Sequence, residues 1–215
     1  MQQPFSLQGR VALITGGGTG IGFDIAKCFL ASGATVIITG RREDVLKEAV
    51  ANLGAGAHFA VNDVADLSLT SQLVTGLVAQ YGAIDILVNN AGVSSFCALD
   101  DPAYEEVWHR ALAVMLTAHQ RMVRAALPWL RQSDAARIVN IASTEGLGAT
   151  PGDTPYVAAK TGVIGLTRGL AVDLGPEGIT VNCICPGPIR TAMTDAVAEE
   201  HKTIFAKRRT ALCRY

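Results

Sequence analysis

The sequence predicts an α/β fold in which a doubly wound parallel sheet is covered by helices on both faces. Six short, apolar, β-branched runs alternate with segments of helical periodicity, which is the pattern of βαβ units. Hydrophobic residues make up 49% of the 215 residues and charged residues only 17%, as suits a parallel sheet buried on both faces. Each run is followed by glycine, small polar or charged residues. A single ligand across that edge of the sheet explains these six segments together.

The expected elements follow one another without interruption along the chain. The apolar runs predict strands at 10–15, 34–39, 57–61, 84–89, 136–142 and 179–184. Helical patterns between them cover about 20–32, 43–53, 66–81, 103–130 and 154–174. Because no repeat, low-complexity tract or linker divides the chain, we expect one domain over residues 1–215.

Charge and cysteine usage narrow the classes of function. The net charge of −1 provides no global field for nucleic acid or an anionic membrane. The basic cluster at Lys207, Arg208, Arg209 and Arg214 is interpreted as a solvated helix face. The five cysteines lack metal-ligand spacing, and no secretory leader or membrane-length apolar run is present. We therefore expect a soluble cytoplasmic protein with reduced thiols and no metal, nucleic-acid or membrane partner.

The first strand is followed by a glycine-rich stretch, "GGGTGIG". Gly16, Gly20 and Gly22 form a G-x-x-x-G-x-G pattern, which fits neither the G-x-G-x-x-G fingerprint nor the P-loop. Glycines lacking Cβ atoms allow a close approach to a pyrophosphate, whose charge a helix N-terminus favours. A plain strand-to-helix turn is the alternative.

The segment after the second strand, "GRRED", bears on the choice of cofactor. An acidic residue there usually contacts the ribose 2′-hydroxyl of NAD, whereas arginine accommodates the 2′-phosphate of NADP. Arg41 and Arg42 come first, and Glu43 and Asp44 suit the first turn of the next helix. NADP(H) is therefore favoured, with Arg41 the better candidate, and NAD(H) is the alternative.

Three further residues suggest proton transfer. Tyr156 and Lys160 are four positions apart at the start of a helix, and so on one face. An ammonium close to a phenol stabilises the phenolate and lowers its pKa. Ser143, at the end of the fifth strand, offers a hydroxyl to a substrate oxygen. Separately, each residue also has an ordinary structural explanation.

The chain resembles the short-chain dehydrogenase/reductase family in its single-domain, Rossmann-fold form. The resemblance runs from about residue 7 to the end of the chain and rests on "TGGGTGIG", "NDV", "NNAG", Ser143, "YVAAK" and "PGPIRT", in the family's order and spacing.

The resemblance implies roles for these residues. Tyr156 would be the general acid/base, Lys160 would lower its pKa and hold the nicotinamide ribose, and Ser143 would position the reacting oxygen. Asp63 and Val64 would contact the adenine, and Asn89 to Gly92 would line the cofactor. Ile189 and Thr191 would meet the nicotinamide amide. The implied cofactor-binding set is Gly16, Gly18, Thr19, Gly20, Ile21, Gly22, Arg41, Arg42, Asp63, Val64, Asn90, Ala91, Gly92, Tyr156, Lys160, Pro186, Gly187, Ile189 and Thr191.

Two features depart from the family pattern. In "LAVMLTAH", Met115 stands where the family has an asparagine that helps to hold a proton-relay water. An apolar helix stripe explains Met115, and His119, one turn later, is a less favoured substitute for the asparagine. The chain also ends before the family's last helix and seventh strand, as expected of either a fragment or a shortened member.

Two functions are therefore expected from the sequence. The first is an NADP(H)-preferring oxidoreductase that interconverts a small-molecule carbonyl compound and an alcohol, assembled as a homodimer or homotetramer. The second is a catalytically weak cofactor-binding or scaffold protein, suggested by Met115 and the missing end. The intact Ser143, Tyr156 and Lys160 set favours the first.

Overall fold

The computed structural model describes residues 5–191, 194–195 and 197–215. Its centre is a six-stranded parallel sheet with the strand order β3-β2-β1-β4-β5-β6. The strands are β1 (Val11–Thr15), β2 (Thr35–Gly40), β3 (Ala57–Val61), β4 (Ile86–Asn89), β5 (Arg137–Ile141) and β6 (Thr180–Ile184). The α-helices are α1 (Gly20–Ala31), α2 (Glu43–Leu53), α3 (Leu67–Tyr81), α4 (Tyr104–Leu112), α5 (Ala118–Leu130), α6 (Thr154–Leu174) and α7 (Glu199–Arg209).

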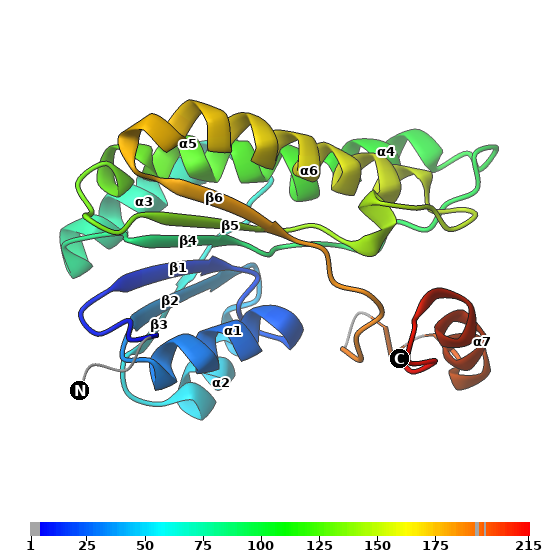
Figure 1. The fold of residues 1–215 in the computed structure, drawn as a ribbon, viewed down its shortest axis with the longest axis horizontal. Coiled ribbons are helices and arrows are strands. Elements are labelled where there is room, and N and C mark those ends of the chain that lie inside the picture. The colour runs from blue at the N-terminus through cyan, green and yellow to red at the C-terminus, as the bar shows by residue number, and fades with distance from the viewer. Residues whose placement is uncertain (1–4, 192–193, 196) are drawn as a thin grey trace.

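Helices cover both faces of the sheet, as Figure 1 shows, with α1 and α2 on one face and α3 to α6 on the other. The alternation of side chains along each strand supplies both interfaces. On β1, Leu13 belongs to the core under α3, α5 and α6, whereas Ile14 belongs to the core under α1 and α2. This two-sided burial explains why the strands read as continuous apolar runs.

The predicted doubly wound parallel sheet is confirmed, and each strand begins and ends within two residues of the expected range. The predicted helix at 103–130 differs, because a π-helical turn, η1 (Ala113–Thr117), separates α4 from α5. Two short 3₁₀ turns, η2 (Thr144–Gly146) and η3 (Gly175–Glu177), and α7 complete the described elements. The helix α7 lies beyond the carboxyl edge of the sheet in Figure 1, and Lys207, Arg208 and Arg209 are exposed on its last turn.

The strand β6 lies at one edge of the sheet, and its Thr180, Asn182 and Ile184 are exposed. Among the described residues, no helix combines the length and apolar character needed to cross a membrane. The same residues contain no cluster of His, Cys, Asp or Glu that could hold a metal ion. All five cysteines are free thiols.

Candidate active site

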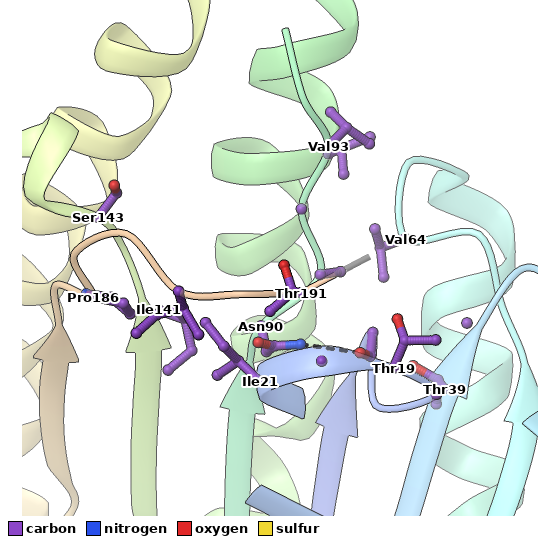
Figure 2. A pocket seen from close by; sticks show the side chains of 18 of the residues that line it. Thr19, Ile21, Thr39, Val64, Asn90, Val93, Ile141, Ser143, Pro186 and Thr191 are labelled. Atoms are coloured by element: carbon purple, nitrogen blue, oxygen red, sulfur yellow. Dashed lines mark hydrogen bonds between the residues drawn. The ribbon is translucent and has the colours of Figure 1, made fainter. Parts of the chain in front are cut away.

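The main pocket lies at the carboxyl edge of the sheet, where the chain leaves β1 and β4. Strand order reverses between these two neighbours, and doubly wound sheets bind ligands at such a switch point. The pocket has a volume of about 330 Å³, and Figure 2 shows side chains from several strand ends facing it. Its walls come from segments that are far apart in the sequence, including the glycine stretch, the end of β5 and the start of α6.

The glycine stretch forms the floor of this pocket. Gly16 and Gly20 have φ values of +65° and +55°, which strongly favour glycine. Gly22 lies beneath the loop, where a Cβ atom would come 2.5 Å from the carbonyl oxygen of Gly16. At the N-cap of α1, the Thr19 side chain makes no hydrogen bond to the helix. The N-terminus of α1 therefore faces the pocket with its dipole unopposed, an arrangement suited to an anion.

Asn90 joins the glycine stretch to the end of β4. Its side-chain nitrogen donates hydrogen bonds to the carbonyl oxygens of Thr15, at 3.0 Å, and Gly16, at 3.1 Å; Figure 2 shows this amide directed at the glycine loop. In return, the Thr15 hydroxyl oxygen accepts hydrogen bonds from the backbone N–H groups of Asn90 and Ala91, at 3.0 and 3.1 Å. Asn90 thus holds the shape of the pocket as well as lining it.

A second group of polar residues lines the end of the pocket next to β2 and β3. Arg41 and Arg42 are exposed there and enter none of the ion pairs among the described residues. Glu43 instead pairs with Lys47 at 2.9 Å along α2, which confirms its reading as a first-turn helix residue.

Thr39 and Asn62 line the pocket but were given no role from the sequence, although Asn62 begins the motif "NDV". The Thr39 hydroxyl and both amide atoms of Asn62 are buried without a hydrogen-bond partner. Such groups are costly to bury unless a ligand or water satisfies them. Thr39 lies near the end of β2, and Asn62 directly follows β3. Their positions at strand ends were the sequence feature that could have identified them as pocket residues. Together with the arginines and the α1 N-terminus, they fit an adenine nucleotide that carries phosphate groups.

The other end of the pocket contains Ser143, Tyr156 and Lys160. Ser143 follows β5 and is 9% exposed; its hydroxyl oxygen accepts a hydrogen bond from the Glu145 N–H at 3.1 Å. Tyr156 and Lys160 lie on the first turns of α6, as the four-residue spacing predicted. The Lys160 ammonium is 5.6 Å from the centre of the Tyr156 ring and donates a hydrogen bond to the carbonyl oxygen of Ile141 at 2.8 Å.

The surroundings of Tyr156 correct the expectation that its pKa is lowered. Burial raises the pKa of Tyr156, the carboxylates of Asp153 and Glu145 add to the rise, and a hydrogen bond with Ser143 opposes it. The protein alone therefore moves the pKa of this phenol in the direction opposite to that expected from Lys160. Burial also lowers the pKa of Lys160 to about 8, because desolvation disfavours a charged ammonium.

Met115 lies in the π-helical turn and is fully buried. It packs in a small apolar cluster that includes Ala159 and touches Tyr156, as the apolar-stripe reading predicts. His119, the alternative polar group, is 1% exposed. Burial and the nearby Lys160 charge lower its pKa to about 3, so this imidazole is neutral in the fold.

The pocket brings together nearly all of the residues singled out in the sequence. These are Gly16, Gly18, Thr19, Gly20, Ile21, Arg41, Arg42, Asp63, Val64, Asn90, Ala91, Gly92, Ser143, Tyr156, Lys160, Pro186, Gly187, Ile189 and Thr191. Gly22 supports the floor from below, outside the lining. Asn89 was wrongly expected to line the pocket: it is 1% exposed and donates its amide to Asn140 inside the sheet, at 2.9 Å.

A doubly wound parallel sheet with a glycine-floored pocket at its switch point defines a Rossmann-like α/β protein. Residues 10–202 match the family model described as short chain dehydrogenase. The chain belongs to this family.

Relatives and solved structures agree with this assignment. The chain is 38% identical over 197 residues to D-beta-hydroxybutyrate dehydrogenase of Cupriavidus necator, covering 90% of this chain and 76% of the relative. It is 38% identical over 205 residues to a 3-oxoacyl-(acyl-carrier-protein) reductase of Chlamydia muridarum, covering 94% and 82%. A crystal structure of an actinorhodin polyketide ketoreductase variant with NADPH superposes with a TM-score of 0.88 at 34% identity, covering 100% of this chain and 87% of that one. These relatives are oxidoreductases by name.

Proposed function

We propose that this protein is an NADP(H)-preferring oxidoreductase that interconverts a small-molecule ketone or aldehyde and its alcohol. The observation that carries the proposal is that Ser143, Tyr156 and Lys160 line the same pocket as the glycine stretch. A hydroxyl, a phenol and an ammonium beside a nucleotide pocket are the groups that proton transfer coupled to hydride transfer requires.

In this proposal, Tyr156 handles the proton. Its phenol donates a proton to the carbonyl oxygen during reduction and takes the proton back from the hydroxyl during oxidation. Ser143 lines the same pocket as the phenol and orients the reacting oxygen beside it. Lys160, held by the Ile141 carbonyl, contributes positive charge near the phenolate and holds the ribose next to the nicotinamide. The bound nicotinamide supplies or accepts the hydride.

The cofactor preference rests on the adenosine end of the pocket. Arg41 and Arg42 face it, with no acidic residue at the corresponding strand end to receive a ribose 2′-hydroxyl. A 2′-phosphate would gain charge-assisted hydrogen bonds from these side chains. Asp63 and Val64 would contact the adenine. Asn62 and Thr39 would satisfy their buried polar atoms on the nucleotide or on ordered water.

The wider setting of the protein is part of the proposal. We take residues 1–215 as one dinucleotide-binding domain, working in the cytoplasm as a homodimer or homotetramer on a small carbonyl or alcohol compound. The names of the relatives, a hydroxybutyrate dehydrogenase and ketoacyl reductases, support the carbonyl and alcohol chemistry.

The test is a panel of ketones and aldehydes assayed by loss of NADPH absorbance, with NADH in parallel. We expect at least one compound to be reduced, with NADPH preferred, and Tyr156→Phe to lower kcat by about 100-fold or more while NADPH still binds. Tyr104→Phe is the matched control, because its phenol contacts Thr154 at the start of the same helix, at 2.8 Å. Full activity in Tyr156→Phe would refute the mechanism.

A catalytically weak cofactor-binding or scaffold role is the second candidate. The observation that favours it is Met115, which places a thioether where the resembled family has an amide. Tight NADPH binding together with inactivity on the whole panel would support this role and exclude the first.

A further inference from the structure

The helix α7 is anchored to the rest of the domain at both ends. Near its start, the Glu199 carboxylate accepts hydrogen bonds from both terminal guanidinium nitrogens of Arg190, at 2.8 and 2.9 Å. Near its end, Arg209 donates a hydrogen bond to the Ala149 carbonyl at 2.6 Å. The helix is therefore held beside the segment that leads from η2 into α6, the helix that carries the proposed proton-transfer residues.

A second cavity lies between α7 and this segment, with a volume of about 280 Å³. One wall is formed by Thr150 and Pro151. The other wall is a single face of α7, because spacings of three and four residues bring side chains together on a helix. That face consists of His201, Ile204, Phe205, Arg208 and Arg209. Within the described residues, none lines both this cavity and the pocket at the switch point of the sheet.

The middle of the α7 face is apolar. Ile204 is 42% exposed, and Phe205 and Pro151 lie in the same lining. The Phe205 ring is supported by an edge-on contact with Tyr215, with the ring centroids 6.4 Å apart. A hydrocarbon group that covers this surface removes apolar area from water, which is favourable. The cavity therefore suits a ligand that has an apolar part.

The two ends of the same face are basic. His201 lies at one end, and Arg208 and Arg209 lie at the other. None of the three belongs to an ion pair within the described part of the chain. Arg209 bonds to a neutral backbone carbonyl, and its guanidinium lies 6.0 Å from the centre of the Phe205 ring. The two arginines thus offer unpaired positive charge beside the apolar surface.

The acidic residues of α7 do not supply the missing negative charge. Glu199 is already held by Arg190 at 2.8 Å and by Lys202 at 2.9 Å. Glu200 is exposed on the first turn, two turns from Arg208, and lies outside the lining. Among the described residues, no Asp or Glu lines the cavity. An anionic ligand would therefore be the first opposite charge for this end of the helix.

We propose that this cavity is a binding site for an amphipathic organic anion, namely a carboxylate or phosphate attached to a short apolar chain. The anion would bind Arg208 and Arg209 through charge-assisted hydrogen bonds, and the chain would cover Ile204. Both parts are needed, because an exposed ion pair alone contributes little in water. The inference goes beyond the proposed function and does not depend on it. The anion has two possible sources, the remote end of a substrate and a separate molecule.

The experiment uses octanoate as the probe. The comparison compounds are 1-octanol, which has the chain without the anion, and acetate, which has the anion without the chain. Ligand-observed NMR gives their dissociation constants on the natural chain, Arg208→Gln and Ile204→Ser. Lys207→Gln is the matched control, because it removes an adjacent exposed charge of α7 that lies outside the lining.

We expect octanoate to bind at least tenfold more tightly than 1-octanol or acetate. Its Kd should rise about tenfold in Arg208→Gln and about fivefold in Ile204→Ser, and less than twofold in Lys207→Gln. Both test positions are exposed, so thermal unfolding should show intact folds. Octanoate that binds no better than either comparison compound overturns the inference. Equal weakening in Arg208→Gln and Lys207→Gln also overturns it, since the effect would then reflect net charge alone.

Reduction of 7-oxooctanoate and of its methyl ester by NADPH distinguishes the two sources of the anion. If the cavity holds the remote end of a substrate, the natural chain prefers the acid by about tenfold in kcat/KM, and Arg208→Gln loses this preference. If the cavity holds a separate molecule, the acid and the ester are reduced equally while octanoate still binds. If neither compound is reduced but octanoate binds as expected, the inference holds and the proposed function fails for these ketones.

Discussion

The Lys160 ammonium lies 5.6 Å from the centre of the Tyr156 ring, but its hydrogen bond goes to the Ile141 carbonyl at 2.8 Å. The ammonium is thus held at the end of β5 while its charge faces the phenol. Lys160 is only 3% exposed, so the protein keeps a charged group in a poorly solvated place. Such an arrangement costs stability and is common where a charge serves a function.

Replacing Lys160 by methionine should therefore separate stability from activity. The folded pKa of about 8 lies below the ordinary value, so the unfolded chain binds this proton more tightly, and at pH 7 the fold carries the full penalty. Lys160→Met should raise the free energy of unfolding at pH 7 by about 3 kcal/mol and lower kcat/KM by about 100-fold. Urea unfolding and steady-state kinetics measure both, and Lys47→Met, on the surface, is the control. A destabilised Lys160→Met would contradict the prediction.

Gly22 supports the floor of the pocket, where a Cβ atom would come 2.4 Å from Asn90 Nδ2 and 2.5 Å from the Gly16 carbonyl oxygen. Gly22→Ala should therefore displace the glycine loop, weaken NADPH binding more than tenfold and destabilise the chain by about 2 kcal/mol. Gly76→Ala is the matched control, because Gly76 lies on a helix with open space around its Cβ position. That control should be neutral or slightly stabilising. Fluorescence titration with NADPH and urea unfolding would test both variants, and unchanged binding in Gly22→Ala would exclude the loop from the cofactor site.

Arg41 should determine the choice between the two nicotinamide cofactors. Its exposed guanidinium faces the pocket without an ion-pair partner in the described part of the chain, so a 2′-phosphate would be its first strong partner. Arg41→Ala should raise the Kd of NADPH by about tenfold and leave the Kd of NADH nearly unchanged. Arg124→Ala, at an exposed position on α5, controls for the loss of one positive charge. Equal weakening of both cofactors would count against the NADP(H) preference.

Met115→Asn should raise turnover while lowering stability. The side chain is fully buried against Ala159 and next to Tyr156, so an amide there loses apolar packing at a cost of about 2 kcal/mol. The same amide could hold a water near the Lys160 side of the site, which the thioether cannot. Met122→Asn, at an equally buried position farther along the helix, should lower stability without raising turnover. An unchanged turnover number in Met115→Asn across pH 6–9 would reject the relay explanation.

His119 should make the protein sensitive to acid. The folded pKa of about 3 lies below the ordinary value of about 6.5, so the unfolded chain takes up the proton first as the pH falls. Stability is then lost below about pH 6.5, by about 2 kcal/mol on reaching pH 5. His119→Gln should flatten this slope in urea unfolding between pH 4 and 8, whereas His109→Gln, at an exposed position on α4, should not. The same slope in both variants would assign the acid sensitivity to other groups.

The strands and most helices could be predicted because their signals are local. Each buried strand is a β-branched run between turn residues, and Gly54, which follows α2 at φ +84°, is a helix-ending signal that the sequence displays. The π-helical turn at Ala113–Thr117 could not be predicted, because the apolar stripe continues through it with ordinary helical spacing. Its insertion depends on how α4 and α5 pack against α6 and the sheet.

Asn89 and Asn90 illustrate the same limit within the site. The motif "NNAG" marks this strand end, but side chains of consecutive residues in a strand point in different directions. Asn89 bonds to Asn140 inside the sheet, whereas Asn90 braces the glycine loop. Only the register of β4 between β1 and β5 decides which of the two residues faces the pocket.

The sequence by itself determined the layered α/β architecture and which segments meet at the carboxyl edge of the sheet, since alternation and residue spacing are properties of the chain. The tertiary structure alone decided the electrostatics at that edge. Burial raises the pKa of Tyr156, lowers those of Lys160 and His119, and leaves one carboxylate oxygen each of Glu145 and Asp153 without a hydrogen-bond partner in the protein. Desolvation depends on every atom surrounding a group, so residue spacing cannot supply it.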